Sequence, residues 1–294
     1  MRPESLALLL VAALLHALVN VLLKQARDKL AFTWWLLGAS SVMGAPLLYF
    51  GGPQNLEGWG WVTLSGLLEA AYFVTLSRAY SLGDLSQVYP IARGSAPLFI
   101  VAWAGLFLQE ERSIGGLCGV ALIVAGIYLI NLPSLSAWSK PLAGFREPAL
   151  RWALLTGFLI SLYQTVDKIG INHVAPVAYL VLILMVAWIA LTPQWLFAER
   201  RQALISEIAP GTASLTRKVW GRILLGAVLG NSAYLLVLWV MRTNPVSYVA
   251  PVREVSVVMG SWLGVRFFGE RGGNVRIIAA MLIAGGILLI FTAG

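Results

Sequence analysis

Four ionisable residues stand inside long apolar stretches of the sequence, where charge is costly. They are Glu69, Arg93, Arg253 and Glu254. A charged side chain in the hydrocarbon region of a bilayer costs at least about 2.5–3.5 kcal/mol on insertion scales. Each of these side chains therefore needs a partner, a water-filled cavity or a substrate of opposite charge.

Two of these charges follow prolines in similar phrases. Pro90 of LSQVYP and Pro251 of VSYVAP are 161 residues apart, and so are Arg93 and Glu254. Proline removes a backbone donor, and broken helices at membrane depth are tolerated where they line a cavity. We expect helix breaks at both prolines, and Arg93 close to Glu254. The pair is either a locking salt bridge or, with Arg253, a site for a charged or zwitterionic substrate.

Glu69 and His16 are candidates for proton coupling. A buried carboxylate that lacks a cation keeps its proton, because desolvation disfavours the anion. Glu69 is either such a group or the structural partner of an arginine in the next helix. His16 shares a polar helix face with Asn20 and Lys24, at i, i+4 and i+8. There it is either a proton relay or a hydrogen-bonded helix contact.

Neutral polar residues within apolar runs are candidates for hydrogen bonds to a substrate. Tyr72 and Tyr234 occupy near-equivalent positions of the two similar halves. Together with Asn231, Gln164 and Asn20 they supply donors and acceptors. For each residue taken alone, packing inside the protein is the alternative.

The composition places most of the chain in lipid. Of 294 residues, 59% are hydrophobic and 12% are charged, and mean hydropathy is +0.80. Soluble domains carry about a quarter charged residues. The net charge of +8 does not indicate nucleic acid, because the basic residues lie between apolar runs, where they orient the chain and meet lipid headgroups.

Ten apolar runs are long enough to cross a bilayer, which takes about 20 residues. We expect an all-α membrane protein with ten transmembrane helices, at residues 4–24, 31–50, 58–80, 84–108, 113–132, 149–171, 175–197, 218–241, 245–268 and 273–293. The first run has no strong basic flank and no convincing cleavage site, so we expect it to be retained as a span.

The runs divide into two halves, residues 1–134 and 149–294. Similar phrases recur at an offset of about 160 residues, including Glu110 with Glu270 and IVAGIYLI with IAGGILLI. Because each half has an odd number of spans, the halves cross the membrane in opposite senses. Such inverted repeats are typical of secondary transporters with a midplane site.

Lysine and arginine gather on the odd-numbered connections between runs, which are expected to be cytoplasmic. Both termini should then face away from the cytoplasm.

No motif for enzyme chemistry is present. The chain has no Walker loop, no HExxH, no GxSxG and no carboxylate–histidine cluster at metal spacing, and its single cysteine, Cys118, excludes an internal disulfide. We therefore expect no catalytic residues, no cofactor and no metal.

The order and duplication of these phrases resemble the drug/metabolite transporter superfamily, in its EamA-like ten-span branch. The phrases that carry the resemblance are GDLSQVYPIARGSAPLF with LFLQEE, and NPVSYVAPVREVSVVMG with FFGE. The resemblance implies a basket in which spans one to four and six to nine surround a cavity, with spans five and ten to one side. It also implies that Arg93, Glu254, Glu69 and Tyr234 face the cavity. Members of this branch generally have cytoplasmic termini, whereas the distribution of basic residues here predicts termini on the opposite side.

The function expected is secondary-active transport, as an exporter of small polar metabolites such as amino acids. The protein would be a multi-pass protein of a bacterial inner membrane, monomeric or homodimeric, with lipid and a small-molecule substrate as partners. One alternative is a flippase of lipid-linked sugars or lipids, which predicts a cavity open sideways to lipid. The other is an enzyme acting on lipid headgroups, which requires a clustered nucleophile or metal site.

Overall fold

The computed structural model describes residues 1–50, 53, 55–83, 85–130, 132, 147–209, 211–259 and 274–293. Within these residues the regular structure is helical, with no strand. The first half contains α1 (Pro3–Lys24), α2 (Lys29–Gly44), the short 3₁₀ helix η1 (Ala45–Phe50), α3 (Leu56–Leu82), α4 (Leu85–Leu106) and α5 (Ile114–Ile130). The second half contains α7 (Pro148–Gly170), α8 (Pro176–Leu191), η3 (Thr192–Leu196), α9 (Ala198–Ile208), α10 (Ala213–Thr243), α11 (Val246–Arg253) and α13 (Asn274–Ala293).

The helices begin where the sequence supplies start signals. Pro3, Pro148 and Pro176 occupy the first position of α1, α7 and α8, where proline has the right φ and lacks only a donor that is unused anyway. Asp28 and Asn55 cap α2 and α3 by accepting backbone N–H groups. These caps satisfy donors that the first helical turn leaves free.

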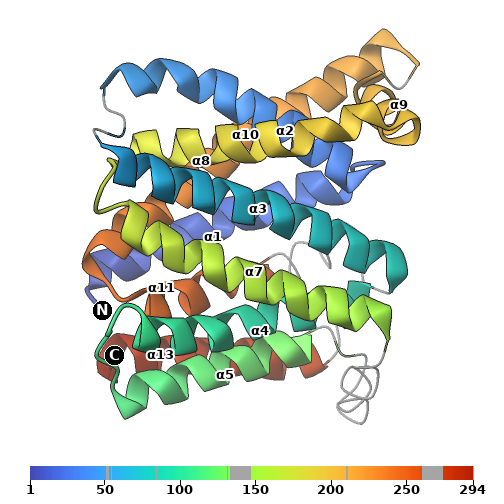
Figure 1. Ribbon diagram of the computed structural model, residues 1–294. Coiled ribbons are helices and arrows are strands. Elements are labelled where there is room, and N and C mark those ends of the chain that lie inside the picture. The colour runs from blue at the N-terminus through green and yellow to red at the C-terminus, as the bar shows by residue number, and fades with distance from the viewer. Residues whose placement is uncertain are drawn as a thin grey trace.

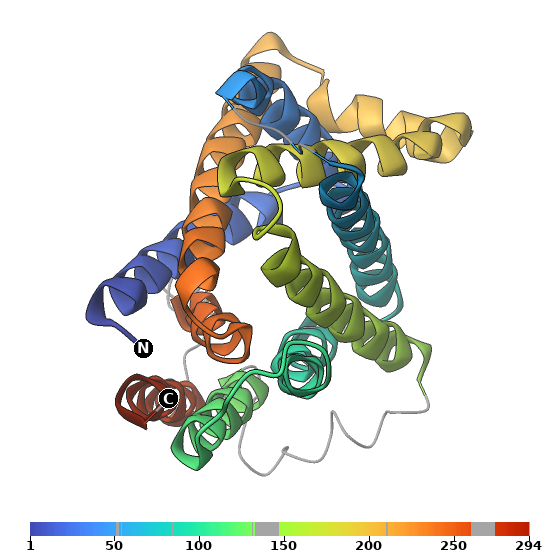
Figure 2. The same cartoon turned by 60° about the vertical axis from the view of Figure 1, so that its left-hand side comes forward.

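The long helices run side by side along one common direction (Figure 1). Both termini lie at the same end of this bundle, and α9 lies at the other end. Seen from a second side, α5 and α13 pack together at one edge, beside the ring formed by the other helices (Figure 2). This arrangement places the candidate spans five and ten outside the ring.

Glycines bring α5 and α13 into close contact. A Cβ atom added at Gly119 would lie 2.6 Å from the carbonyl oxygen of Gly286, and one added at Gly286 would lie 2.5 Å from that of Gly119. No side chain fits at such distances. Small residues that let backbones approach are characteristic of helix pairs in membranes.

The length and composition of the helices identify a membrane protein. Five stretches in the described part of the chain are long and apolar enough to cross a bilayer: Pro3–Leu23, Lys29–Tyr49, Pro176–Leu196, Ala213–Thr243 and Val275–Ala293. Ile91–Leu106 and Ile114–Ile130 are shorter apolar helices, while α3 and α7 have membrane-crossing lengths of 27 and 23 residues. The count of ten spans stays a prediction.

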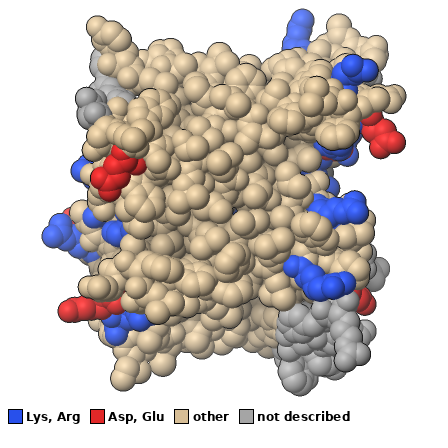
Figure 3. Space-filling view, viewed as in Figure 1, with Lys and Arg blue, Asp and Glu red and all other residues tan. Residues whose placement is uncertain are grey.

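Charged side chains lie mainly at the two ends of the bundle, and the broad middle of the face in Figure 3 is almost free of them. Lysine and arginine dominate at the end that carries α9. At that end Arg200 pairs with Asp28 at 2.7 Å. Partial burial by itself raises the pKa of Asp28, but hydrogen bonds from Arg200 and from the Ala31 N–H hold that pKa below its usual value.

Candidate functional site

A cavity of about 140 Å³ lies inside the ring of helices. Its walls come from α1, α2, α3, α4, α7, α8, α10 and α11, and none of its lining residues belongs to α5 or α13. The polar and aromatic residues of the lining are His16, Asn20, Thr33, Ser40, Glu69, Tyr72, Phe73, Arg93, Tyr163, Asn231, Tyr234 and Arg253. A water molecule needs about 10–15 Å³ of such space, so the cavity admits several waters or a small solute.

The charged residues of α4 and α11 meet beside this cavity. The Nη1 atom of Arg93 lies 3.4 Å from Oε1 of Glu254, and Nη2 of Arg253 lies 3.7 Å from the same oxygen. The exposed fractions of the three residues are only 6%, 4% and 2%. The contact between Arg93 and Glu254 that the repeat predicts is therefore present. Glu254 does not line the cavity itself but holds the two arginines that do.

The helix break in this region lies at Glu254, not at a proline. Helix α11 passes through Pro251, ends at Arg253 and gives way to a turn at Glu254, and residues 255–259 are helical again. The expectation of a break at Pro90 is wrong, because α4 runs without interruption from Leu85 to Leu106. A proline in the second turn removes one backbone hydrogen bond, which a long helix tolerates.

Glu110 fixes the start of α11. Its Oε1 accepts the N–H of Val246 at 2.7 Å, and its Oε2 accepts the N–H and hydroxyl of Ser247 at 3.1 and 2.7 Å. A carboxylate satisfies free donors there and also interacts favourably with the positive end of the helix dipole. This contact ties the connection after α4 to the short helix that carries Arg253. Glu270, the repeat equivalent of Glu110, lies outside the described residues.

Three polar atoms in the cavity wall are buried and have no hydrogen-bond partner within the described residues. They are Nε2 of His16, Oγ of Ser40 and Oε2 of Glu69. Buried polar groups are nearly always hydrogen-bonded, because an unpaired one costs about 1–3 kcal/mol. All three belong to residues that line the same cavity. Water or a polar solute in the cavity would satisfy them.

Asp167 is a site residue that the sequence analysis did not select. It is fully buried on α7, and three hydroxyl groups donate to it: Ser65 and Tyr179 to Oδ1, the latter at 2.9 Å, and Tyr234 to Oδ2. These donors come from α3, α8 and α10. A carboxylate with three hydroxyl donors is well solvated by the protein. An acidic residue within the expected sixth span, residues 149–171, was the available signal.

Tyr234 connects the Asp167 cluster to the charged group. Its hydroxyl donates to Asp167, and its ring lies 5.5 Å from the guanidinium carbon of Arg253. A cation over an aromatic ring at this distance is attracted by the π-electrons. Tyr234 therefore holds Arg253 at the cavity wall while being held itself by α7.

Most of the residues predicted for the site line the cavity. They are Arg93, Arg253, Tyr234, Asn231, Tyr72, Asn20, Glu69 and His16. Gln164 does not line it: this residue is 1% exposed, and its neighbour Tyr163 faces the cavity instead. At 3.6 residues per turn, successive helical residues point about 100° apart, and the rotation of α7 turns Tyr163 rather than Gln164 toward the cavity.

The cavity has no arrangement for metal chemistry in the described part of the chain, where no group of three or more His, Cys, Asp or Glu residues is close enough to hold an ion. What the site offers is binding chemistry: two arginines, one carboxylate with an unpaired oxygen, a histidine and several hydroxyl and amide groups.

Fold and site together define a multi-pass α-helical membrane protein with a charged internal cavity. The model of the EamA-like transporter family matches residues 4–132 and again residues 148–292, and the chain belongs to this family.

Two relatives extend the comparison. A protein of Sinorhizobium sp, named "Uncharacterized transporter in cobO 3'region", is 34% identical over 80 residues, which are 26% of this chain and 56% of that protein. The chain thus spans about half the length of this curated relative. A crystal structure of another protein covers 98% of this chain and 96% of its own, with a TM-score of 0.73 and 15% identity. At that identity the likeness concerns the fold alone.

Proposed function

We propose that the protein is a secondary-active transporter that exports small polar metabolites, with amino acids as the substrate class, across a bacterial inner membrane. The observation that carries the proposal is a buried cavity whose wall holds Arg253, Glu69 and the unpaired atoms of His16 and Ser40. Charge inside a bilayer is expensive unless it is paired or functional. Membership of the EamA-like transporter family supports transport as the activity.

The charges of the wall match a zwitterion. The cavity-lining arginines Arg93 and Arg253 both approach one oxygen of Glu254, and their guanidinium groups at the wall attract an anionic group of a substrate. The α-carboxylate of an amino acid supplies it. Oε2 of Glu69 has no partner in the described part of the chain and is the natural acceptor for the α-amino group.

The size of the cavity supports a small substrate. Sites for drug-sized ligands measure about 300–1,000 Å³, and this cavity measures about 140 Å³. A solute with few non-hydrogen atoms fits without displacing the helices.

Glu69 also gives a route for coupling to protons. An ammonium group and a proton compete for the same carboxylate, because each neutralises it. If the carrier can switch between its inward-open and outward-open forms only when Glu69 is neutralised, each proton that enters is exchanged for a substrate molecule that leaves. This exchange would drive export by the proton gradient.

A flippase or a headgroup enzyme receives less support from the site. The charged residues of the wall are buried, at 4–8% exposed for Arg253, Arg93 and Glu69, so these charges do not lie at a lateral opening to lipid. The cavity lining contains polar groups suited to binding rather than a nucleophile with an adjacent base.

The experiment is a thermal-shift screen of amino acids, amines, sugar phosphates and drugs on the purified protein, followed by flux into liposomes for each hit. We expect amino acids to raise the unfolding temperature and to be transported, because a ligand that binds only the native state stabilises it. Stabilisation by sugar phosphates alone, or ligand binding without flux, would contradict the proposal.

A further inference from the structure

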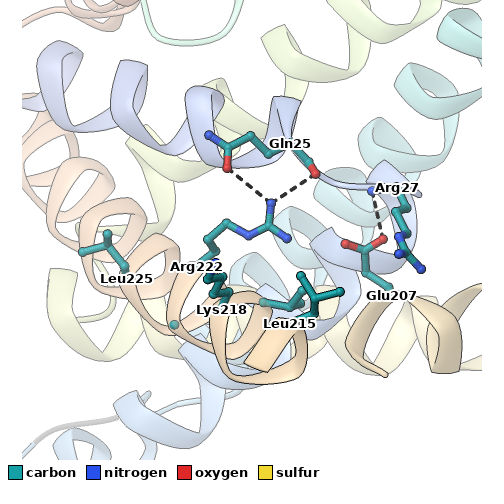
Figure 4. Close-up of a pocket in the computed structure, with 9 residues that line it drawn as sticks. Gln25, Arg27, Glu207, Leu215, Lys218, Arg222 and Leu225 are labelled. Atoms are coloured by element: carbon teal, nitrogen blue, oxygen red, sulfur yellow. Dashed lines mark hydrogen bonds between the residues drawn. The ribbon is translucent and has the colours of Figure 1, made fainter. Parts of the chain in front are cut away.

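A second cavity, of about 510 Å³, lies at the end of the bundle that carries α9. Its walls come from the end of α1, the end of α9 and the first turns of α10. The lining residues are Gln25, Arg27, Glu207, Leu215, Lys218, Val219, Gly221, Arg222 and Leu225. Figure 4 shows Arg222 reaching from α10 to Gln25 at the end of α1.

We propose that this cavity binds the headgroup of an anionic phospholipid, between the end of α1 and the start of α10. The inference is independent of which solute the central cavity transports. It rests on the charge, the depth and the apolar surroundings of this site.

The charge of the cavity favours an anion. Arg27, Lys218 and Arg222 line it against one carboxylate, that of Glu207. Glu207 is 1% exposed, and its Oε2 already accepts the backbone N–H groups of Arg27 and Asp28 at 3.0 Å each. The carboxylate is thus engaged in holding the α1–α2 connection, which leaves Lys218 and the Nε of Arg222 available to a ligand.

The basic side chains differ in how they are held. Arg222 donates through Nη1 to the carbonyl and side-chain oxygens of Gln25, at 3.1 and 3.3 Å, while its Nε has no partner in the described residues. Lys218 lies one turn earlier on α10 and is exposed. A phosphate accepts hydrogen bonds from both types of donor.

The depth of the site matches the headgroup layer. Helix α10 has 31 residues and is therefore about 46 Å long, against a hydrocarbon core of about 30 Å. The excess of about 16 Å corresponds to about 11 residues, which is the length of α10 from Ala213 to just past Arg222, and in the proposed placement this part lies at the headgroup layer. Basic pockets between helices at this depth attract anionic lipids.

The apolar surroundings match acyl chains. Leu215 and Leu225 line the cavity and are 42% and 50% exposed. Leu224, next to Leu225, and Val228, about one turn further along α10, are 46% and 47% exposed. A headgroup at Lys218 and Arg222 would therefore have its chains lying on an apolar face of the same helix. A free phosphate would leave that face unused.

The test measures the thermal unfolding of the purified full-length protein in detergent, titrated with phosphatidylglycerol, phosphatidylcholine or inorganic phosphate. We expect phosphatidylglycerol to raise the unfolding temperature well above the effect of phosphatidylcholine. Lys218→Gln should weaken the apparent affinity for phosphatidylglycerol about tenfold or more, because it removes an ionised donor to the phosphate, and hydrogen bonds to charged groups contribute about 1.5 kcal/mol or more. Arg222→Gln should weaken it by a similar factor.

Arg217→Gln is the matched control, because Arg217 is the exposed neighbour of Lys218 on α10 and does not line the cavity. It should leave the affinity for phosphatidylglycerol unchanged. Equal weakening by Arg217→Gln and Lys218→Gln would reduce the effect to general surface charge and overturn the proposal. Equal stabilisation by the two lipids would overturn it too. Stabilisation by inorganic phosphate that Lys218→Gln removes, without a further effect of lipid, would assign the site to free phosphate instead.

Discussion

Arg93 and Glu254 lie 161 residues apart in the sequence, yet their side chains approach within 3.4 Å and are almost fully buried. The contact joins α4 of the first half to the turn after α11 in the second half. Because Arg253 approaches the same carboxylate oxygen, one anion holds two cations at the wall of the central cavity. Both arginines line the cavity to which we assign substrate binding.

Loss of Glu254 should be severe for both stability and transport. Glu254→Ala leaves two buried arginines without their shared anion, and breaking a buried ion pair costs about 3–5 kcal/mol. Arg93→Ala should abolish transport as well. Thermal unfolding in detergent and liposome flux measure the two effects.

The control for this prediction is the half-exposed pair of Arg200 and Asp28 at the bundle end. Arg200→Ala should cost no more than about 1 kcal/mol, since solvent screens exposed pairs, and should leave transport intact. Normal transport by both Glu254→Ala and Arg93→Ala would reduce the buried pair to a packing element.

Glu69→Gln should remove the pH dependence of transport while leaving the protein folded. The amide keeps the shape of the side chain but cannot exchange a proton, and its charged neighbours are Asp167 and Arg253. Uptake by proteoliposomes at a series of pH values is the measurement. A pH profile identical to that of the wild type would remove Glu69 from coupling.

Two tyrosines that donate to Asp167 should differ in their effect on transport. Tyr179→Phe and Tyr234→Phe each remove one hydrogen bond to the buried carboxylate, at a cost of about 1–3 kcal/mol. Only Tyr234 also lines the cavity and contacts Arg253. Tyr234→Phe should therefore change the Michaelis constant for substrate, and Tyr179→Phe should affect stability alone. Equal kinetic effects of the two variants would show that both hydroxyl groups act through Asp167 alone and would contradict a separate role of Tyr234 at the cavity wall.

Neighbouring glycines of α13 provide a test of the helix contact with α5. Gly286→Ala places a methyl group against the backbone of Gly119, and overpacking of this kind costs about 1–3 kcal/mol. At Gly285 an added Cβ has only Leu122 in reach, at 4.0 Å, so Gly285→Ala should be tolerated. Thermal unfolding of the two variants decides between these outcomes. Similar unfolding temperatures would contradict the close packing.

The sequence allowed the helical class and the contact of Arg93 with Glu254 to be predicted, because both depend on patterns that survive small errors in span boundaries. Apolar runs of about 20 residues indicate a membrane protein wherever they begin. The equal offset of the prolines and of the charged pair predicts proximity from symmetry alone. The family match over residues 4–132 and 148–292 agrees with the resemblance of the duplicated phrases.

The direction in which individual side chains point could not be predicted. Gln164 was expected in the cavity, but the rotation of α7 places Tyr163 there. Asp167, three residues further, was not among the residues predicted for the site, and the structure buries it among hydroxyl groups of three other helices. A step of one residue along a helix turns the side chain by about 100° around the helix axis. A single sequence does not determine how each helix is rotated about its axis.

The most direct test of a charged, substrate-binding cavity compares amino-acid flux in proteoliposomes under an imposed pH gradient for the wild type, Arg253→Gln and Arg201→Gln. Arg253 lines the cavity and Arg201 is exposed on α9. We predict gradient-driven flux for the wild type and Arg201→Gln, and its loss in Arg253→Gln without loss of the folded state. Undiminished flux in Arg253→Gln would contradict the account.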